Sequence, residues 1–121
     1  MKIAVIQYDI AWADRQANFN TLRPLINEAA HNGARLIVLP EMFTTGFSME
    51  ARSLAETMAG ATVGWLREEA AALGCAITGS LIVEDGGQHY NRLVWATPQK
   101  SSSPQLMKSQ SISIETGLIG I

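Results

Sequence analysis

The chain has 121 residues, of which 47% are hydrophobic and 17% are charged. This length is enough for one small domain and too short for two, and the apolar content excludes wholesale disorder. The formal net charge is −2 and the nine lysines and arginines are scattered, so neither nucleic acid nor an anionic membrane is expected as a partner. With one cysteine and no long apolar run, we expect a cytoplasmic protein with a small-molecule substrate.

The first third of the chain predicts a strand, a helix and a second strand. Residues 3–8 are apolar and β-branched, which is typical of a buried strand. Asp14 is a candidate N-cap for a helix that ends at Gly33, and Pro24 predicts either a kink or a regular part that begins nearby. Residues 36–39 form a short apolar run that we expect to be a strand parallel to the first. The apolar stripe of the helix consists of Phe19, Leu22, Leu25, Ile26, Ala29 and Ala30.

The next part of the chain predicts a helix followed by a β-hairpin. After a polar connection over residues 49–60, Thr62 is a candidate N-cap for a helix that Gly74 closes. Residues 75–83 and 90–97 are expected to pair as antiparallel strands, because an Asp-Gly-Gly sequence between them is a strong turn signal.

The composition changes after Pro98. Residues 99–121 contain six of the nine serines and three glutamines, and they contain no aromatic residue. We therefore expect residues 1–98 to form one partial α/β domain. Residues 99–121 are expected to be an atypical Ser/Gln-rich tail, as a frameshift or a truncation would produce.

Glu41 follows the strand expected at residues 36–39, at the end where open α/β sheets place their ligand crevices. Apolar neighbours, among them Phe43 and Phe47, would partly desolvate its carboxylate and raise its pKa toward a value useful for a general base. The alternative is a solvated glutamate in a connecting loop. These residues alone leave both interpretations open.

The sequence around Glu41 resembles a known family. The run Leu-Pro-Glu-Met-Phe over residues 39–43, followed by Thr-Gly-Phe at 45–47, is similar to the first catalytic segment of the nitrilase superfamily, the carbon–nitrogen hydrolases. Residues 2–7, Gly79-Ser80 and Tyr90-Asn91 resemble the family in the same order. The continuation Thr-Thr-Gly-Phe-Ser-Met is most similar to the omega-amidase branch, whose substrates are ω-amides of 2-oxo acids. The resemblance implies the N-terminal half of an α-β-β-α sandwich.

The resemblance also implies a Glu-Lys-Cys triad, in which the glutamate is the general base, the cysteine forms a thioester and the lysine stabilises the oxyanion. Glu41 matches the first of these, and Phe43 and Phe47 would line the substrate pocket. Lys108 falls near the lysine position but lacks the aromatic and acidic lead-in and the following arginine. Cys75 precedes that position, whereas the family's cysteine follows it, so we interpret Cys75 as a buried core residue.

Complete relatives would hydrolyse a small ω-amide of the 2-oxoglutaramate type to a carboxylate and ammonia without a cofactor. This chain, without its lysine and cysteine, is expected to be inactive alone. Its two histidines lack metal-ligand spacing, so no metal is expected.

Two alternatives stay open. The chain could be a non-catalytic α/β interaction module that forms a homodimer or pairs with a full-length relative, because an incomplete sheet leaves apolar faces uncovered. The sequence could also be part of a longer product whose missing residues restore the triad.

Overall fold

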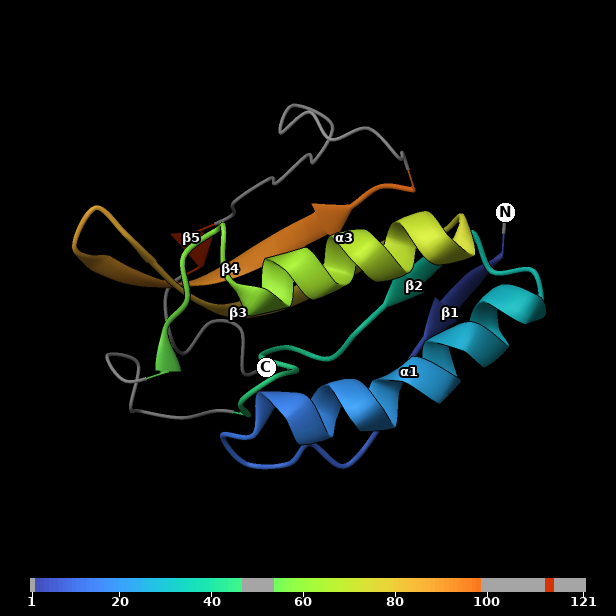
Figure 1. Cartoon of the computed structure of the whole chain (residues 1–121), viewed down its shortest axis with the longest axis horizontal. Helices are drawn as coiled ribbons and strands as arrows, with labels where there is room; N and C mark the ends of the chain where they lie inside the picture. The colour runs from blue at the N-terminus through green and yellow to red at the C-terminus, as the bar shows by residue number, and fades with distance from the viewer. Residues whose placement is uncertain (1, 47–53, 99–112, 115–121) are drawn as a thin grey trace.

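A computed structural model describes residues 2–46, 54–98 and 113–114 (Figure 1). In this part of the chain, two helices lie against one mixed sheet with the strand order β1-β2-β3-β4-β5. None of the helices described is long and apolar enough to cross a membrane. The helices are α1 (Arg15–His31) and α3 (Ala61–Leu73), and the strands are β1 (Ile3–Val5), β2 (Leu36–Val38), β3 (Ala76–Asp85), β4 (Gln88–Ala96) and β5 (Ser113–Ile114).

The sheet combines a parallel part with an antiparallel hairpin. β1 pairs with β2 and β2 with β3 in parallel, so the carboxyl ends of β1 and β2 point toward the same end of the sheet. The parallel pairing of β1 and β2, with α1 between them in the chain, confirms the predicted strand-helix-strand unit, and the antiparallel pairing of β3 and β4 confirms the hairpin. β1 ends at Val5 rather than Tyr8 because its partner β2 ends at Val38, shortly before Pro40.

The ends of α1 agree with the sequence pattern. The Asp14 carboxylate accepts a hydrogen bond from the Ala17 backbone N–H at 3.0 Å, which confirms the predicted N-cap. Gly33 follows the helix with a φ of +94°, a conformation that glycine adopts readily. The helix begins at Arg15 and continues through Pro24, so the predicted alternative of a regular part that begins near the proline is wrong.

The start of α3 differs from the prediction. Its N-cap is Gly60, and Thr62 lies inside the helix, so the predicted capping role of Thr62 is wrong. The acceptor comes instead from Glu56, whose Oε1 lies 2.8 Å from the Thr62 backbone nitrogen. The Thr62 hydroxyl donates to the same carboxylate, which suits the positive end of a helix dipole. α3 ends as predicted at Gly74, whose φ is +67°.

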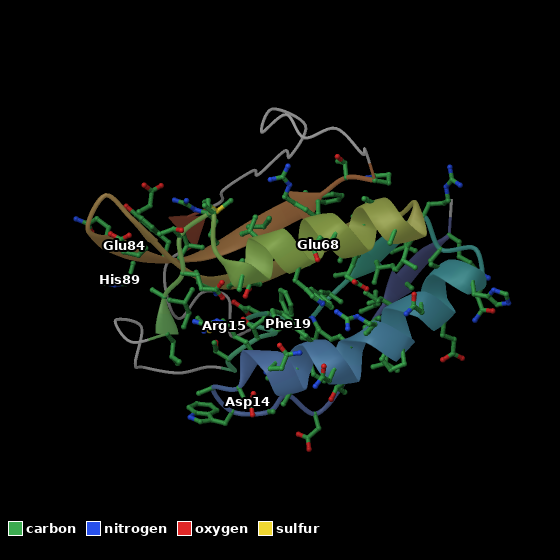
Figure 2. All side chains as sticks on the ribbon, viewed as in Figure 1. Asp14, Arg15, Phe19, Glu68, Glu84 and His89 are labelled. Carbon is green, nitrogen blue, oxygen red and sulfur yellow. The ribbon has the colours of Figure 1, made fainter. Side chains whose placement is uncertain are left out.

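The hydrophobic core lies between the two helices and one face of the sheet. Phe19 of α1 stacks on Trp65 of α3 with ring centroids 4.7 Å apart, and Figure 2 shows Phe19 between the helices. The face of β1 that points away from this core is uncovered, because Ile3 is 51% and Val5 68% exposed. The fully buried aliphatic residues of the core include Leu22, Ile26, Ile37, Leu66, Ile77, Leu81, Val83 and Val94.

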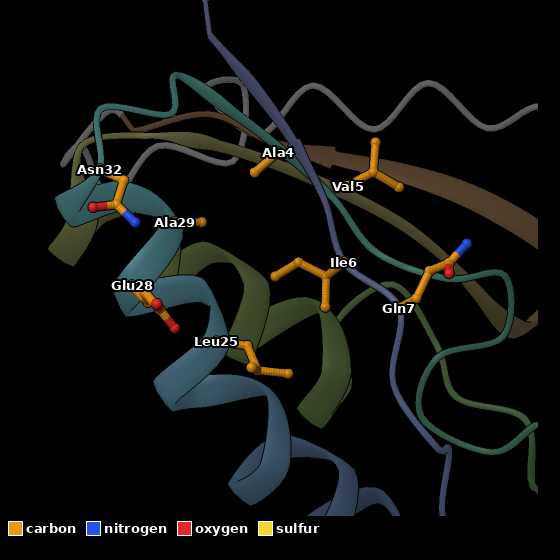
Figure 3. Close-up of a pocket in the computed structure, with 8 residues that line it drawn as sticks. All are labelled: Ala4, Val5, Ile6, Gln7, Leu25, Glu28, Ala29 and Asn32. Carbon is orange, nitrogen blue, oxygen red and sulfur yellow. The ribbon is translucent and has the colours of Figure 1, made fainter.

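A groove of about 280 Å³ opens between β1 and the C-terminal half of α1 (Figure 3). β1 is the first strand in the sheet order, so no described strand pairs with its outer edge. The groove does not include Glu41. Its lining consists of Ala4, Val5, Ile6, Gln7, Leu25, Glu28, Ala29 and Asn32.

Candidate functional site

Glu41 lies directly beyond β2, at the end of the sheet where the parallel strands β1 and β2 also end. Its side chain is half-buried. Asn91 of β4 donates a hydrogen bond from Nδ2 to Glu41 Oε2 at 2.9 Å, so the carboxylate is held against the hairpin.

Two opposing influences set the acidity of Glu41. Burial raises the pKa of the Glu41 carboxyl above its ordinary value, and the hydrogen bond from Asn91 acts in the opposite direction. The net shift is upward. A carboxylate with a raised pKa is a better proton acceptor than an ordinary surface glutamate, which is the property a general base requires.

The turn that follows Glu41 is held in an uncommon conformation. Met42 has a φ of +50°, in the left-handed region that residues other than glycine rarely adopt. Its backbone N–H donates to Ser80 Oγ at 2.9 Å, and its carbonyl accepts from the Gly46 N–H at 2.8 Å. These contacts offset the cost of the left-handed conformation and fix the direction in which Glu41 leaves the strand.

Gly79 makes room for the same turn. A Cβ atom at Gly79 would lie 2.9 Å from two ring carbons of Phe43 and 3.1 Å from Leu39 Cβ. Phe43 is fully buried, and its ring centroid lies 6.2 Å from that of Trp65. The Phe43 side chain therefore supports the turn from within the core, and its expected contact with a substrate stays a prediction.

Side chains from α1 and from the segment after β1 hold the other side of the turn. The buried amide of Asn18 donates to the Thr44 carbonyl at 2.8 Å and to the Ala11 carbonyl at 2.9 Å. The Tyr8 hydroxyl donates to the Phe43 carbonyl. Burial raises the pKa of Tyr8 well above its usual range, so the phenol remains a donor.

Cys75 lies far from Glu41. It precedes the first residue of β3, whereas Asn91, the partner of Glu41, pairs with Ile82 near the other end of that strand. At the rise of an extended strand, Cys75 and Ile82 lie about 20 Å apart along the chain. Cys75 is 3% exposed and its thiol donates to the Ala34 carbonyl at 3.0 Å, so its interpretation as a buried core residue is confirmed.

Phe47 and Lys108 lie outside the described residues, so their roles in the pocket and at the oxyanion stay predictions. Within the described ranges, no group of three or more His, Cys, Asp or Glu residues could hold a metal ion. Sequence reasoning assigned no role to Ser80 or Asn91, although both belong to the dipeptides that carried the family resemblance. Only the folded structure shows that Ser80 contacts the Met42 backbone and that Asn91 contacts the Glu41 carboxylate.

A carboxylate held at the carboxyl end of a parallel strand, with a raised pKa, defines an α/β protein with a candidate acid–base site. The family model described as carbon-nitrogen hydrolase matches residues 2–112. The chain therefore belongs to the carbon–nitrogen hydrolase family, as its sequence predicted.

Individual relatives agree with this assignment. A nitrilase from Pyrococcus abyssi is 32% identical over 104 residues, which are 82% of this chain and 40% of that protein. The omega-amidase YafV of Yersinia enterocolitica is 33% identical over 100 residues, or 81% of this chain and 37% of the relative. A solved structure of a CN-hydrolase superfamily protein from Xanthomonas campestris is 43% identical with a TM-score of 0.72, over 79% of this chain and 36% of that chain.

The chain thus spans two fifths or less of the length of these proteins. The structural match confirms the predicted α/β fold as a partial nitrilase-type fold. The family match continues past Pro98, where the sequence predicted an atypical tail. The boundary at Pro98 stays a prediction.

Proposed function

We propose that this chain carries the general base of a carbon–nitrogen hydrolase that acts on small ω-amides of 2-oxo acids, such as 2-oxoglutaramate. The observation that supports this function is the half-buried Glu41 carboxylate beyond β2, with its raised pKa and its hydrogen bond from Asn91. The similarity to an omega-amidase supports the substrate class.

In the proposed reaction, Glu41 removes the proton from a cysteine thiol, and the thiolate attacks the amide carbon. The amide C–N bond breaks, ammonia leaves with a proton returned by Glu41, and a thioester remains. Glu41 then takes a proton from water, which hydrolyses the thioester to the carboxylate and returns the thiol. The thiol and the oxyanion-stabilising lysine that the family resemblance implies are not supplied by Cys75 or any other residue near Glu41 in the described ranges. We therefore propose that the chain by itself releases no ammonia.

A chimera tests this function. Residues 2–98 of this chain replace the matching segment of the Yersinia enterocolitica omega-amidase, which supplies the rest of the family fold. We expect ammonia release from 2-oxoglutaramate, with kcat reduced about 10²- to 10⁴-fold by Glu41→Gln because the general base is lost.

Cys75→Ser in the same chimera is the matched control, and its rate should be unchanged. The unfused chain is assayed alongside and should release nothing. A folded chimera without activity, or one whose rate survives Glu41→Gln, would contradict the proposal.

A second candidate function is a non-catalytic module that pairs with a full-length carbon–nitrogen hydrolase. The observation that favours it is the face of β1 on which Ile3 and Val5 are exposed, beside a strand edge with which no described strand pairs. Because the chain spans two fifths or less of its relatives, the partner we propose for this face is a full-length member of the family.

Light scattering of the chain mixed with the Yersinia enterocolitica omega-amidase measures this pairing. We expect the mass of the mixture to exceed that of the enzyme alone, and Val5→Lys to abolish the increase by placing a charge on the apolar face. Asn20→Lys, on an exposed part of α1, should leave it intact. An unchanged mass, or equal loss in both variants, would exclude this function.

A further inference from the structure

We propose that Asn91 is a positioning residue for Glu41: its side-chain amide aims the carboxylate and holds it in the ionised form. This inference rests on the proposed role of Glu41 as a general base. It concerns a residue outside the Glu-Lys-Cys triad.

The hairpin presents two polar side chains to consecutive residues of the Glu41 turn. Ser80 of β3 pairs with Leu93 and Ile82 pairs with Asn91, so Ser80 and Asn91 lie on the same face of the hairpin. Ser80 accepts the backbone N–H of Met42, and Asn91 donates to the side chain of the residue before it. One contact therefore fixes the backbone of the turn and the other fixes the carboxylate.

The amide of Asn91 does little else for the fold. Asn91 is 6% exposed, its Nδ2 donates to Glu41, and its Oδ1 is buried with no hydrogen-bond partner in the described part of the chain. An unpaired buried acceptor is unfavourable for folding. Asn18 shows the contrast, because both ends of its buried amide bond to the backbone. Asn18 has the contacts of a structural residue, whereas the one side-chain hydrogen bond described for Asn91 goes to Glu41.

This contact has a chemical consequence. An N–H donor stabilises the ionised carboxylate, whereas burial favours the protonated one. Burial raises the pKa of the Glu41 carboxyl by more than the Asn91 hydrogen bond lowers it. Removing the donor would leave burial unopposed, so the carboxyl would hold its proton to a higher pH and the base would be weakened near neutral pH.

The test is a pH titration of the Glu41 carboxyl carbon by ¹³C NMR in the full chain, with the resonance assigned from its absence in Glu41→Gln. Asn91→Leu removes the donor while keeping the number and branching of the side-chain heavy atoms, and it should raise the pKa of Glu41 by about one unit. Asn91→Asp places a second carboxyl against the first, and it should give a two-step titration whose upper step lies higher still. Thr78→Val is the matched control, because it removes a buried hydrogen bond in the same hairpin, from Thr78 Oγ1 to the Val94 carbonyl, without touching Glu41.

A Glu41 pKa in Asn91→Leu equal to that of the wild type would overturn the proposal. So would loss of folding in both Asn91 variants while Thr78→Val stays folded, because the amide would then be structural. The titration needs no turnover. An inactive chimera would therefore count against the proposed hydrolysis alone, and an unmoved pKa against Asn91 alone.

Discussion

Glu56→Gln is expected to lower the free energy of unfolding by about 2 kcal/mol, and Glu56→Ala by about 3 kcal/mol, as measured by urea denaturation. The Glu56 side chain is only 8% exposed, and its Oε2 lies 2.6 Å from Arg15 Nε. Figure 2 shows Arg15 pointing from the start of α1 toward the segment that precedes α3. The same carboxylate accepts from the backbone and hydroxyl of Thr62. Its loss leaves a guanidinium and a helix N–H without their acceptor.

The backbone around Glu56 increases this effect. Glu56 bonds to the Ile82 carbonyl through its N–H at 3.0 Å and to the Glu84 N–H through its carbonyl at 2.7 Å, so the residue lies beside β3 as a short parallel bridge. The carboxylate thus ties α1, α3 and the hairpin together. Weakening it should lower the unfolding midpoint without changing the denaturant slope.

Glu69→Gln is the matched control. Glu69 pairs with Arg23 at 3.6 Å, and the arginine side chain is 49% exposed, so water screens this ion pair. The same substitution should therefore cost at most about 0.5 kcal/mol. Equal losses of unfolding free energy for Glu56→Gln and Glu69→Gln would contradict the conclusion that the buried Glu56 carboxylate links α1, α3 and the hairpin.

Gly79→Ala is expected to destabilise the chain by about 2 kcal/mol, because the added methyl group would lie 2.9 Å from the Phe43 ring, closer than real contacts come, and 3.1 Å from the Leu39 Cβ, which is also tight. Phe43 is fully buried and cannot move into solvent, so the turn that carries Glu41 must shift. We expect a lower urea midpoint and a changed Glu41 resonance in the ¹³C titration.

Gly64→Ala is the same chemical change, but we expect it to stabilise the chain rather than destabilise it. Gly64 lies within α3, and a Cβ there meets nothing within 4 Å. Replacing a helical glycine by alanine should stabilise the chain by about 0.5–1 kcal/mol. A Gly79→Ala variant as stable as the wild type, with the Glu41 resonance unmoved, would show that Phe43 does not hold the turn.

Local sequence was sufficient to predict features that depend on neighbouring residues within a single helix, strand or turn. The Asp14 cap, the glycines that end both helices and the Asp-Gly-Gly turn of the hairpin were all predicted, because each depends on residues adjacent in the chain. The position of Glu41 after a buried strand was predicted for the same reason. Glu84 and His89, which pair across β3 and β4, lie near the tip of the hairpin formed by these strands (Figure 2).

Long-range contacts were not predictable in this way. Thr62 has the residue type of an N-cap, yet the acceptor at the start of α3 is Glu56, because its carboxylate also pairs with Arg15 on the other helix. Asn18 lies within the helix beside the predicted stripe, and its burial follows from its amide's hydrogen bonds to the Ala11 carbonyl, in the loop before the helix, and to the distant Thr44 carbonyl in the turn after Glu41.

The order of strands and helices along the chain, the family and the position of Glu41 directly after β2 therefore follow from periodicity, turn residues and a short motif. The contacts that hold Glu41 do not follow from the sequence alone, because they come from residues that lie close to Glu41 only after β3 and β4 pair beside β2. A buried hydrogen bond such as that from Asn91 depends on strand register, and register is set by the packing of the whole sheet.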